Sequence, residues 1–175
     1  RVAMLILGDL VWLIIIPLGL LVRDAPADGA AASGPDVPVA EIFQSPQFWL
    51  IVLTHFTCCV AHSGPIFHMV THAIDQGIPN MTAATLLGVS GLASLVGRII
   101  SGVVADRWGS KRTLIVMLGL QAPAIFLYLF TTSTAGFYAL ALLFGASYGG
   151  VMPMYALLTR EYFGARAMGT AYGAI

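Results

Sequence analysis

A short charged stretch between two long apolar runs is the feature that most constrains the fold of this chain. Residues 102–112 read GVVADRWGSKR, in a sequence that is 58% hydrophobic and only 9% charged. The runs on either side, 81–105 and 113–130, are each long enough to cross a hydrocarbon layer of ~30 Å, which takes ~20 helical residues. We therefore predict a tight turn at a membrane surface, and its three cations place that surface on the cytoplasmic side.

The overall composition indicates the same class of protein. The formal net charge is zero and the mean hydropathy is +0.88, which is more apolar than a soluble domain of this size requires. The apolar runs do not alternate at period two, which argues against a β-barrel. Cys58 and Cys59 are adjacent inside an apolar run, a placement that fits neither a disulfide framework nor a zinc finger. The expected fold class is all-α, a polytopic transmembrane helical bundle.

The chain divides into three predicted parts. Residues 1–22 form one membrane span, residues 23–46 are a polar linker rich in Ala, Pro, Gly and Asp without a core, and residues 47–175 form a partial bundle. Within the bundle the expected spans are 47–71, 81–105, 113–130, 137–159 and a truncated 167–175. We expect Gly64-Pro65 to kink or interrupt the first of these, because proline removes a backbone hydrogen bond. Six of the eight Lys and Arg fall in segments 23–46, 106–112 and 160–166, which are expected to be cytoplasmic.

The charged stretch also resembles a known family. Its defined positions, which are Gly102, Asp106, Arg107, Gly109, Lys111 and Arg112, match the loop motif G-x-x-x-D-R/K-x-G-x-R/K-R/K of the major facilitator superfamily. The resemblance implies a latch that holds one transport conformation, and a solvated turn with orienting charges is the ordinary alternative. It also implies a fold of twelve helices in two halves joined by a linker. Span 1–22 would then be the sixth helix and the later spans the seventh onward.

The chain begins at Arg1 rather than Met, and we expect it to be a piece of a longer protein. By the resemblance, the missing partner is an N-terminal half of six helices. Because that half would contribute part of the cavity, the piece alone is not expected to transport.

Arg98 is the most informative single residue. It precedes Asp106 by eight positions and therefore lies about 12 Å deeper, near the middle of the membrane. Ser90, Ser94, Arg98 and Ser101 share one helical stripe, which we expect to face the bundle interior. A central guanidinium attracts a carboxylate, because its fork can bind two oxygens. Pairing with a helix from the missing half is the structural alternative.

Around Arg98 the chain resembles, more narrowly, the monocarboxylate and oxalate/formate branch of the superfamily, in which an arginine at this position contacts the substrate carboxylate. The resemblance implies a small organic anion as substrate. One position departs from the pattern: animal monocarboxylate carriers have an Asp where this chain has Ser94, so proton coupling through that Asp does not carry over.

Other polar residues are weaker candidates. His55, Cys59 and His62 recur at i, i+4 and i+7 on one helical face, and they suit a cavity or helix contact, a proton relay or a soft-metal site. His68 and His72 form a single H-x-x-x-H. Asp9 lies inside the first span, where it suits a helix contact or a cation site. Gly145 and Gly149 are a small-x-x-x-small pair suited to close packing, and the nearby Tyr148, Met152 and Tyr155 suit either substrate contact or packing.

The sequence therefore predicts a secondary transporter, not an enzyme, that moves a small organic anion by alternating access in a lipid bilayer. Coupling is expected to be to an ion or an exchanged solute, with no cofactor, metal or nucleic acid, and the expected location is a bacterial inner membrane. The predicted substrate-binding residues are Arg98, Ser94, His62, Tyr148 and Tyr155. The alternatives are a drug or metal-ion exporter of the same superfamily and a membrane-embedded metalloenzyme that uses the His and Cys residues of span 47–71.

Overall fold

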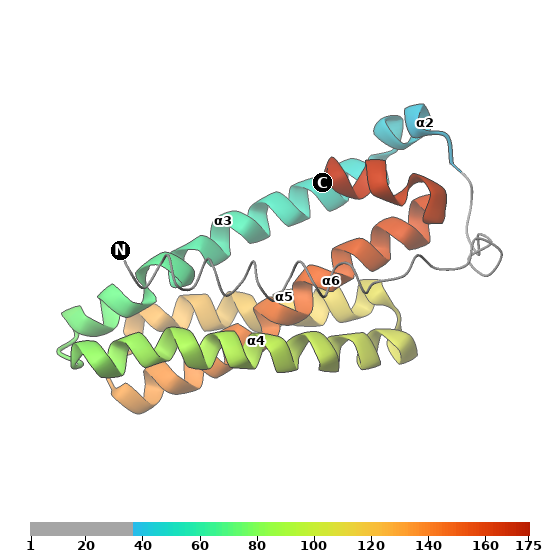
Figure 1. Cartoon of the computed structure of the whole chain (residues 1–175). Coiled ribbons are helices and arrows are strands. Elements are labelled where there is room, and N and C mark those ends of the chain that lie inside the picture. Colours follow the sequence, from blue (N-terminus) through green and yellow to red (C-terminus); the bar gives the residue numbers. More distant parts are fainter. Residues whose placement is uncertain (1–36) are drawn as a thin grey trace, which may run out of the picture. The chain divides into compact units, whose positions relative to one another are not determined.

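A computed structural model describes residues 37–175, and these residues are almost entirely helical (Figure 1). The elements are α2 (Val39–Gln44), α3 (Pro46–Asp75), α4 (Asn80–Trp108), α5 (Ser110–Leu127), the 3₁₀ helix η1 (Tyr128–Phe130) and α6 (Thr134–Gly173). Four segments, α3, α4, α5 with η1, and α6, are long and apolar enough to cross a membrane. The predicted all-α membrane bundle is confirmed for this part of the chain. The predictions for span 1–22, for Asp9 and for linker residues 23–36 lie outside the described residues.

The predicted turn at the charged stretch is a single residue. α4 continues to Trp108 and α5 begins at Ser110, so that only Gly109 leaves the helical conformation, with φ 87° and ψ 151°. This backbone region is open almost only to glycine. Gly77, with φ 83°, lies in the turn that joins α3 to α4 at the opposite end. We call the two ends of the bundle the Gly109 end and the Gly77 end.

α6 consists of two helices that meet at Gly164, which has φ 84° and ψ 169°. Figure 1 shows the chain turning back at this point in the red segment. Residues 160–166, which separate two of the predicted spans, are helical on both sides of this one glycine. The first helix of α6 therefore runs from Thr134 to Gly164, and the second, expected from residue 167, begins directly after the glycine.

The start of the bundle bears on two further expectations. α3 is continuous through Gly64 and Pro65, so the proline does not interrupt the helix, while the alternative prediction of a kink stays a prediction. A membrane helix tolerates one missing donor when its neighbours satisfy the freed group. Residues 37–46 are not a linker without a core. They include α2, whose Ile42 is 1% exposed and belongs to the same buried cluster as Phe48 and Phe163.

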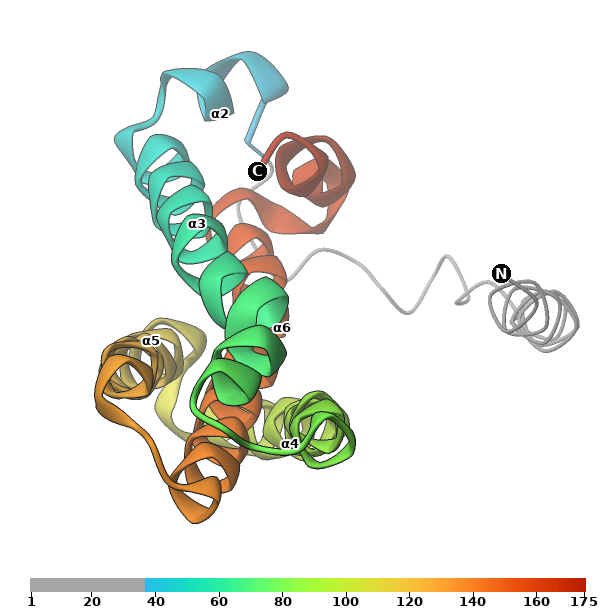
Figure 2. The same ribbon diagram turned by 90° about the vertical axis from the view of Figure 1, so that its left-hand side faces the viewer.

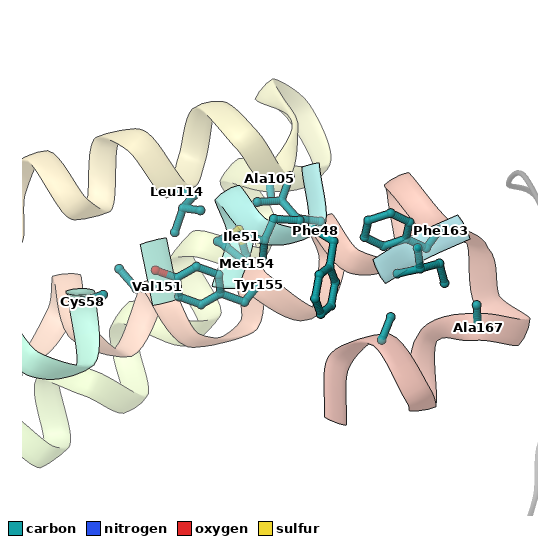
Figure 3. Close-up of a cluster of buried hydrophobic side chains, with 13 residues drawn as sticks. Phe48, Ile51, Cys58, Ala105, Leu114, Val151, Met154, Tyr155, Phe163 and Ala167 are labelled. Atoms are coloured by element: carbon teal, nitrogen blue, oxygen red, sulfur yellow. The ribbon is translucent and has the colours of Figure 1, made fainter. Parts of the chain in front are cut away.

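α6 lies in the middle of the bundle, with α3, α4 and α5 around it (Figure 2). Two buried clusters fill the space between these helices. The one near the Gly109 end includes Phe48, Tyr155 and Phe163, which Figure 3 shows between α3 and the two parts of α6. The one near the Gly77 end includes Met69, Phe137 and Phe144. Tyr155 belongs to the first cluster and Tyr148 packs against the second, so both predicted substrate-binding tyrosines of α6 lie at the hydrophobic core.

Candidate functional site

α4 and α6 meet along a surface made of small residues. A Cβ placed on Gly97 would overlap the backbone carbonyl of Ala146, and a Cβ on Gly145 or Gly149 would overlap the carbonyl of Ser90 or Ser94. The two backbones are thus in direct contact, as in other small-x-x-x-small packings between membrane helices. We call this surface the small-residue seam. The predicted close packing of Gly145 and Gly149 is confirmed, and its partner is α4.

The serines of α4 lie in the small-residue seam, and Arg98 lies outside it. Ser90 and Ser94 are each 7% exposed and Ser101 is fully buried, whereas Arg98 is exposed. At 100° per residue Arg98 lies about 80° round the helix from Ser90, which is far enough to leave the seam. Within residues 37–175, Arg98 therefore lies outside the helix contact that buries the three serines, and its predicted direction toward the cavity stays a prediction. Ser94 lies in a helix contact rather than beside the guanidinium.

Arg98 lies well inside its helix. Eleven residues separate it from Gly109, which corresponds to about 16 Å along the helix axis. Its side chain makes no hydrogen bond or ion pair within residues 37–175. The apolar residues Leu92 and Ile99, 70% and 65% exposed, occupy a different face of α4. Arg98 is thus a deep, exposed cation on a flank of α4 that is neither the seam nor the most apolar face.

α3 meets α6 through rings instead of backbone. Three histidines of α3 each pack on an aromatic ring of α6, and we call these pairs the His–aromatic ladder. The ring centroids are 4.6 Å apart for His55–Tyr155, 4.7 Å for His62–Tyr148 and 5.5 Å for His72–Phe137. The first two pairs are seven residues apart in both helices, and at 1.5 Å per residue this spacing is about 10 Å.

The ladder accounts for three predicted site residues. His62 and Tyr148 are brought together, both half-buried, near the middle of their helices. Tyr155 is fully buried and donates a hydrogen bond to the carbonyl of Thr54 at 3.2 Å, so it is a core residue in this part of the chain. None of the three contacts Arg98 in the described residues.

The cysteine that joins this group is Cys58 and not Cys59. Cys58 is 5% exposed, its Sγ lies 3.9 Å from Nδ1 of His62, and Gln121 of α5 approaches the same sulfur through Nε2 at 3.7 Å. Sequence spacing favoured Cys59, because it shares a stripe with His55 and His62. The two cysteines are 100° apart on the helix, and packing against α5 turns Cys58 inward. Gln121 is 2% exposed and was missed, although a lone amide in an apolar run was a signal for it.

The motif residues lie at the Gly109 end. Asp106, Arg107, Lys111 and Arg112 are exposed, and a Cβ added to Gly102 would meet no atom within 4 Å. Gly102 therefore makes no close contact with a neighbouring helix within residues 37–175. A contact that sequence reasoning missed lies next to the motif: Ser110, 1% exposed, donates a hydrogen bond of 2.6 Å to Oε2 of Glu161 on α6. It ties the start of α5 to α6.

Two cavities lie between α3 and α5. One, of about 290 Å³, is lined by His68, Met69, His72 and Tyr128 toward the Gly77 end. The other, of about 220 Å³, lies toward the Gly109 end and is lined by residues that include Lys111, Leu114 and Tyr155. Arg98 lines neither cavity. In residues 37–175 no three His, Cys, Asp or Glu side chains come together as a metal site would need.

Comparison with known proteins identifies the family of this chain. The family model of the Major Facilitator Superfamily matches residues 1–175. The chain belongs to this superfamily. The four long apolar helices of the described residues fit an integral membrane protein of this superfamily.

Individual relatives are similar at low identity. An uncharacterized MFS-type transporter YhjX of Escherichia coli is 26% identical over 177 residues, covering 96% of this chain and 43% of the relative. Monocarboxylate transporter 13 of Bos taurus is 26% identical, covering 86% and 36%. Monocarboxylate transporter 11 of Mus musculus is 30% identical, covering 68% and 28%. The chain thus spans less than half the length of the curated relatives it matches.

Proposed function

We propose that this chain belongs to the C-terminal half of a secondary transporter that moves a small, monocarboxylate-like anion by alternating access, and that Arg98 binds the carboxylate. The observation that carries the proposal is the position of Arg98. Within residues 37–175 it is the one charged residue in the interior of a membrane-spanning helix, because all the others lie within a few residues of a helix end or turn. A permanent charge at such depth is expensive unless it serves a wet cavity or a partner.

The chemistry of the surroundings supports an anion as the ligand. No described carboxylate lies near Arg98 to neutralise it, so the guanidinium retains its donors for a bidentate contact with an incoming carboxylate. Two of the relatives compared above are named monocarboxylate transporters, which supports the same substrate class. The other half of the site, and the coupling ion or exchanged solute, would belong to the full-length protein.

The distribution of charge supports an orientation. Five cations, Arg107, Lys111, Arg112, Arg160 and Arg166, lie at the Gly109 end, while the turns at the Gly77 end, residues 76–79 and 131–133, contain none. By the positive-inside rule the Gly109 end faces the cytoplasm. In a bacterial cell this membrane is the inner membrane. The motif residues from Gly102 to Arg112 would then act at the cytoplasmic surface as the conformational latch.

The test is uptake of radiolabelled lactate by proteoliposomes that contain the full-length protein. Arg98→Ala should abolish uptake, because the cation that attracts the carboxylate is gone. Arg98→Lys should retain only part of it, because an ammonium keeps the charge but loses the planar fork. Ser94→Ala is the matched control on the same helix, and as a residue of the seam it should leave uptake close to wild type. Normal uptake by Arg98→Ala, with the protein present in the membrane, would remove the substrate argument.

The same preparation distinguishes the anion carrier from the alternative, a drug or metal-ion exporter. If the protein is a drug or metal-ion exporter, wild type and Arg98→Ala will both fail to take up lactate, although both are folded. Net uptake by wild type alone supports the anion carrier.

A further inference from the structure

The three pairs of the His–aromatic ladder differ in how their imidazoles are bonded. His55 and His72 each donate a ring N–H to a backbone carbonyl of another segment, at 3.1 Å to Ile175 and 3.0 Å to Tyr128. A carbonyl only accepts, so each of these two imidazoles is fixed as a donor that links two segments of the chain. Their role in the described structure is to connect helices.

His62 is bonded differently. Its polar contacts in residues 37–175 are with Cys58, one turn earlier in its own helix: Nδ1 lies 3.9 Å from Sγ, and the backbone of Cys58 also interacts with the ring. Both contacts stay within α3, so neither ties His62 to another helix. With Nδ1 turned toward Cys58, Nε2 makes no hydrogen bond to any described residue. The ring can therefore gain or lose a proton at Nε2 without breaking a bond between helices.

The position of His62 suits a group that exchanges protons with water inside a membrane. It lies 16 residues after Pro46, and Tyr148 lies 16 residues before Gly164, so both are about 24 Å along their helices from the Gly109 end. The His62 ring is half-buried, not sealed in the core as Tyr155 is. The Tyr148 ring, whose plane is tilted 56° from the imidazole, offers a π face that stabilises a cation.

We propose that His62 is the proton-coupling residue of this transporter: Nε2 takes up one proton from the water on one side, and the same nitrogen releases it to the other side after the conformational change. No covalent bond forms or breaks other than this N–H bond. The proposal rests on the proposed function and adds the coupling ion to it. A proton that travels with a monocarboxylate makes the overall movement electrically neutral, so the cargo and the ion together carry no net charge.

Two imidazoles lie in this region, and the second, His55, is held as a donor to the Ile175 carbonyl, so His62 is the one free to exchange a proton. The titratable groups are Cys58 and His55 on its own helix and Tyr148 and Tyr155 on α6. α5 contributes only the neutral amide of Gln121 to this region, and Arg98 of α4 makes no contact with the ring. Thiols and phenols ordinarily titrate well above neutral pH, whereas an imidazole changes charge between about pH 5 and pH 8.

The experiment uses proteoliposomes of the full-length protein and radiolabelled lactate in two assays. One measures accumulation above equilibrium driven by an alkaline interior, and the other measures lactate exchange at equal pH on both sides. His62→Gln should lose the driven accumulation and keep exchange. During exchange the transporter changes conformation with lactate bound in both directions, so no net release of a proton is needed. His72→Gln is the control, since its amide can still donate to the carbonyl, and it should keep both. Driven accumulation by His62→Gln with the wild-type pH dependence would overturn the proposal.

A second readout needs no substrate. Diethyl pyrocarbonate modifies neutral, water-accessible imidazoles, and mass spectrometry of the peptide that contains each histidine measures the rate. Between about pH 5 and pH 8 the rate at His62 should rise as the imidazole loses its proton, while His72 stays slow. A His62 that is unmodified throughout this range would also overturn the proposal. If wild-type protein carries no lactate in either assay, the proposed substrate class fails, and the labelling result still decides the role of His62.

Discussion

One side of α6 meets α4 through backbone, and the adjacent side meets α3 through rings. In the small-residue seam, glycines 97, 145 and 149 bring the two chains so close that no side chain separates them. In the His–aromatic ladder, His55, His62 and His72 stand between the helices and hold them further apart. Without a hydrophobic driving force in lipid, direct backbone packing is the tighter of the two solutions. α4 and α6 therefore form a closely packed pair, while the polar contacts between rings lie on the α3 side.

The largest effect is expected from a side chain forced into the seam. Gly97→Val should lower the free energy of unfolding by about 3 kcal/mol, the upper end of what overpacking costs, because Ala146 backbone would have to move. The measurement is the midpoint of SDS-induced unfolding in mixed micelles. Gly91→Val, on the same helix with no atom within 4 Å of an added Cβ, is the control. Equal effects of the two substitutions would mean that the seam is no tighter than the rest of α4.

A smaller effect is expected from removing a cross-link of the ladder. His72→Leu keeps the contact with Phe137 but loses the N–H that bonds the Tyr128 carbonyl, and it should cost about 1–2 kcal/mol in the same unfolding measurement. His68→Leu is the matched control, because His68 is exposed and makes no hydrogen bond within residues 37–175; its cost should be under ~0.5 kcal/mol. A cost at His68 equal to that at His72 would show that the ladder contributes packing alone.

The same comparison shows what could be predicted from the sequence. The class of fold and the four described spans follow from the length of the apolar runs, and the close packing at Gly145 and Gly149 follows from their spacing. Helix ends were placed several residues short, because charged and polar residues such as Asp106 and Glu161 continue a helix beyond the hydrocarbon layer. Gly109 and Gly164 show that a reversal between two spans needs only one residue with positive φ.

The direction of individual side chains could not be predicted in the same way. Helical spacing defines the angle of a side chain around the helix axis only to within tens of degrees. Uncertainty of this size is enough to confuse Cys58 with Cys59, or Arg98 with Ser94, when predicting which side chain turns inward. Which member of each pair turns inward depends on the partner helix: Gln121 of α5 contacts Cys58, and Gly149 of α6 contacts Ser94. Sequence periodicity contains no information about those partners.

The smallest effect distinguishes the two tyrosines of the ladder. Tyr155 donates its hydroxyl to the Thr54 carbonyl in a fully buried position, so Tyr155→Phe should cost about 1 kcal/mol, the usual net contribution of one hydrogen bond. The Tyr148 hydroxyl makes no hydrogen bond to the described residues, and Tyr148→Phe keeps the ring that faces His62, so its cost should be under ~0.5 kcal/mol. Unfolding midpoints measure both. If Tyr148→Phe proves the more costly, its hydroxyl has a structural bond, and His62 then lies against a fixed wall of the bundle instead of a surface open to water.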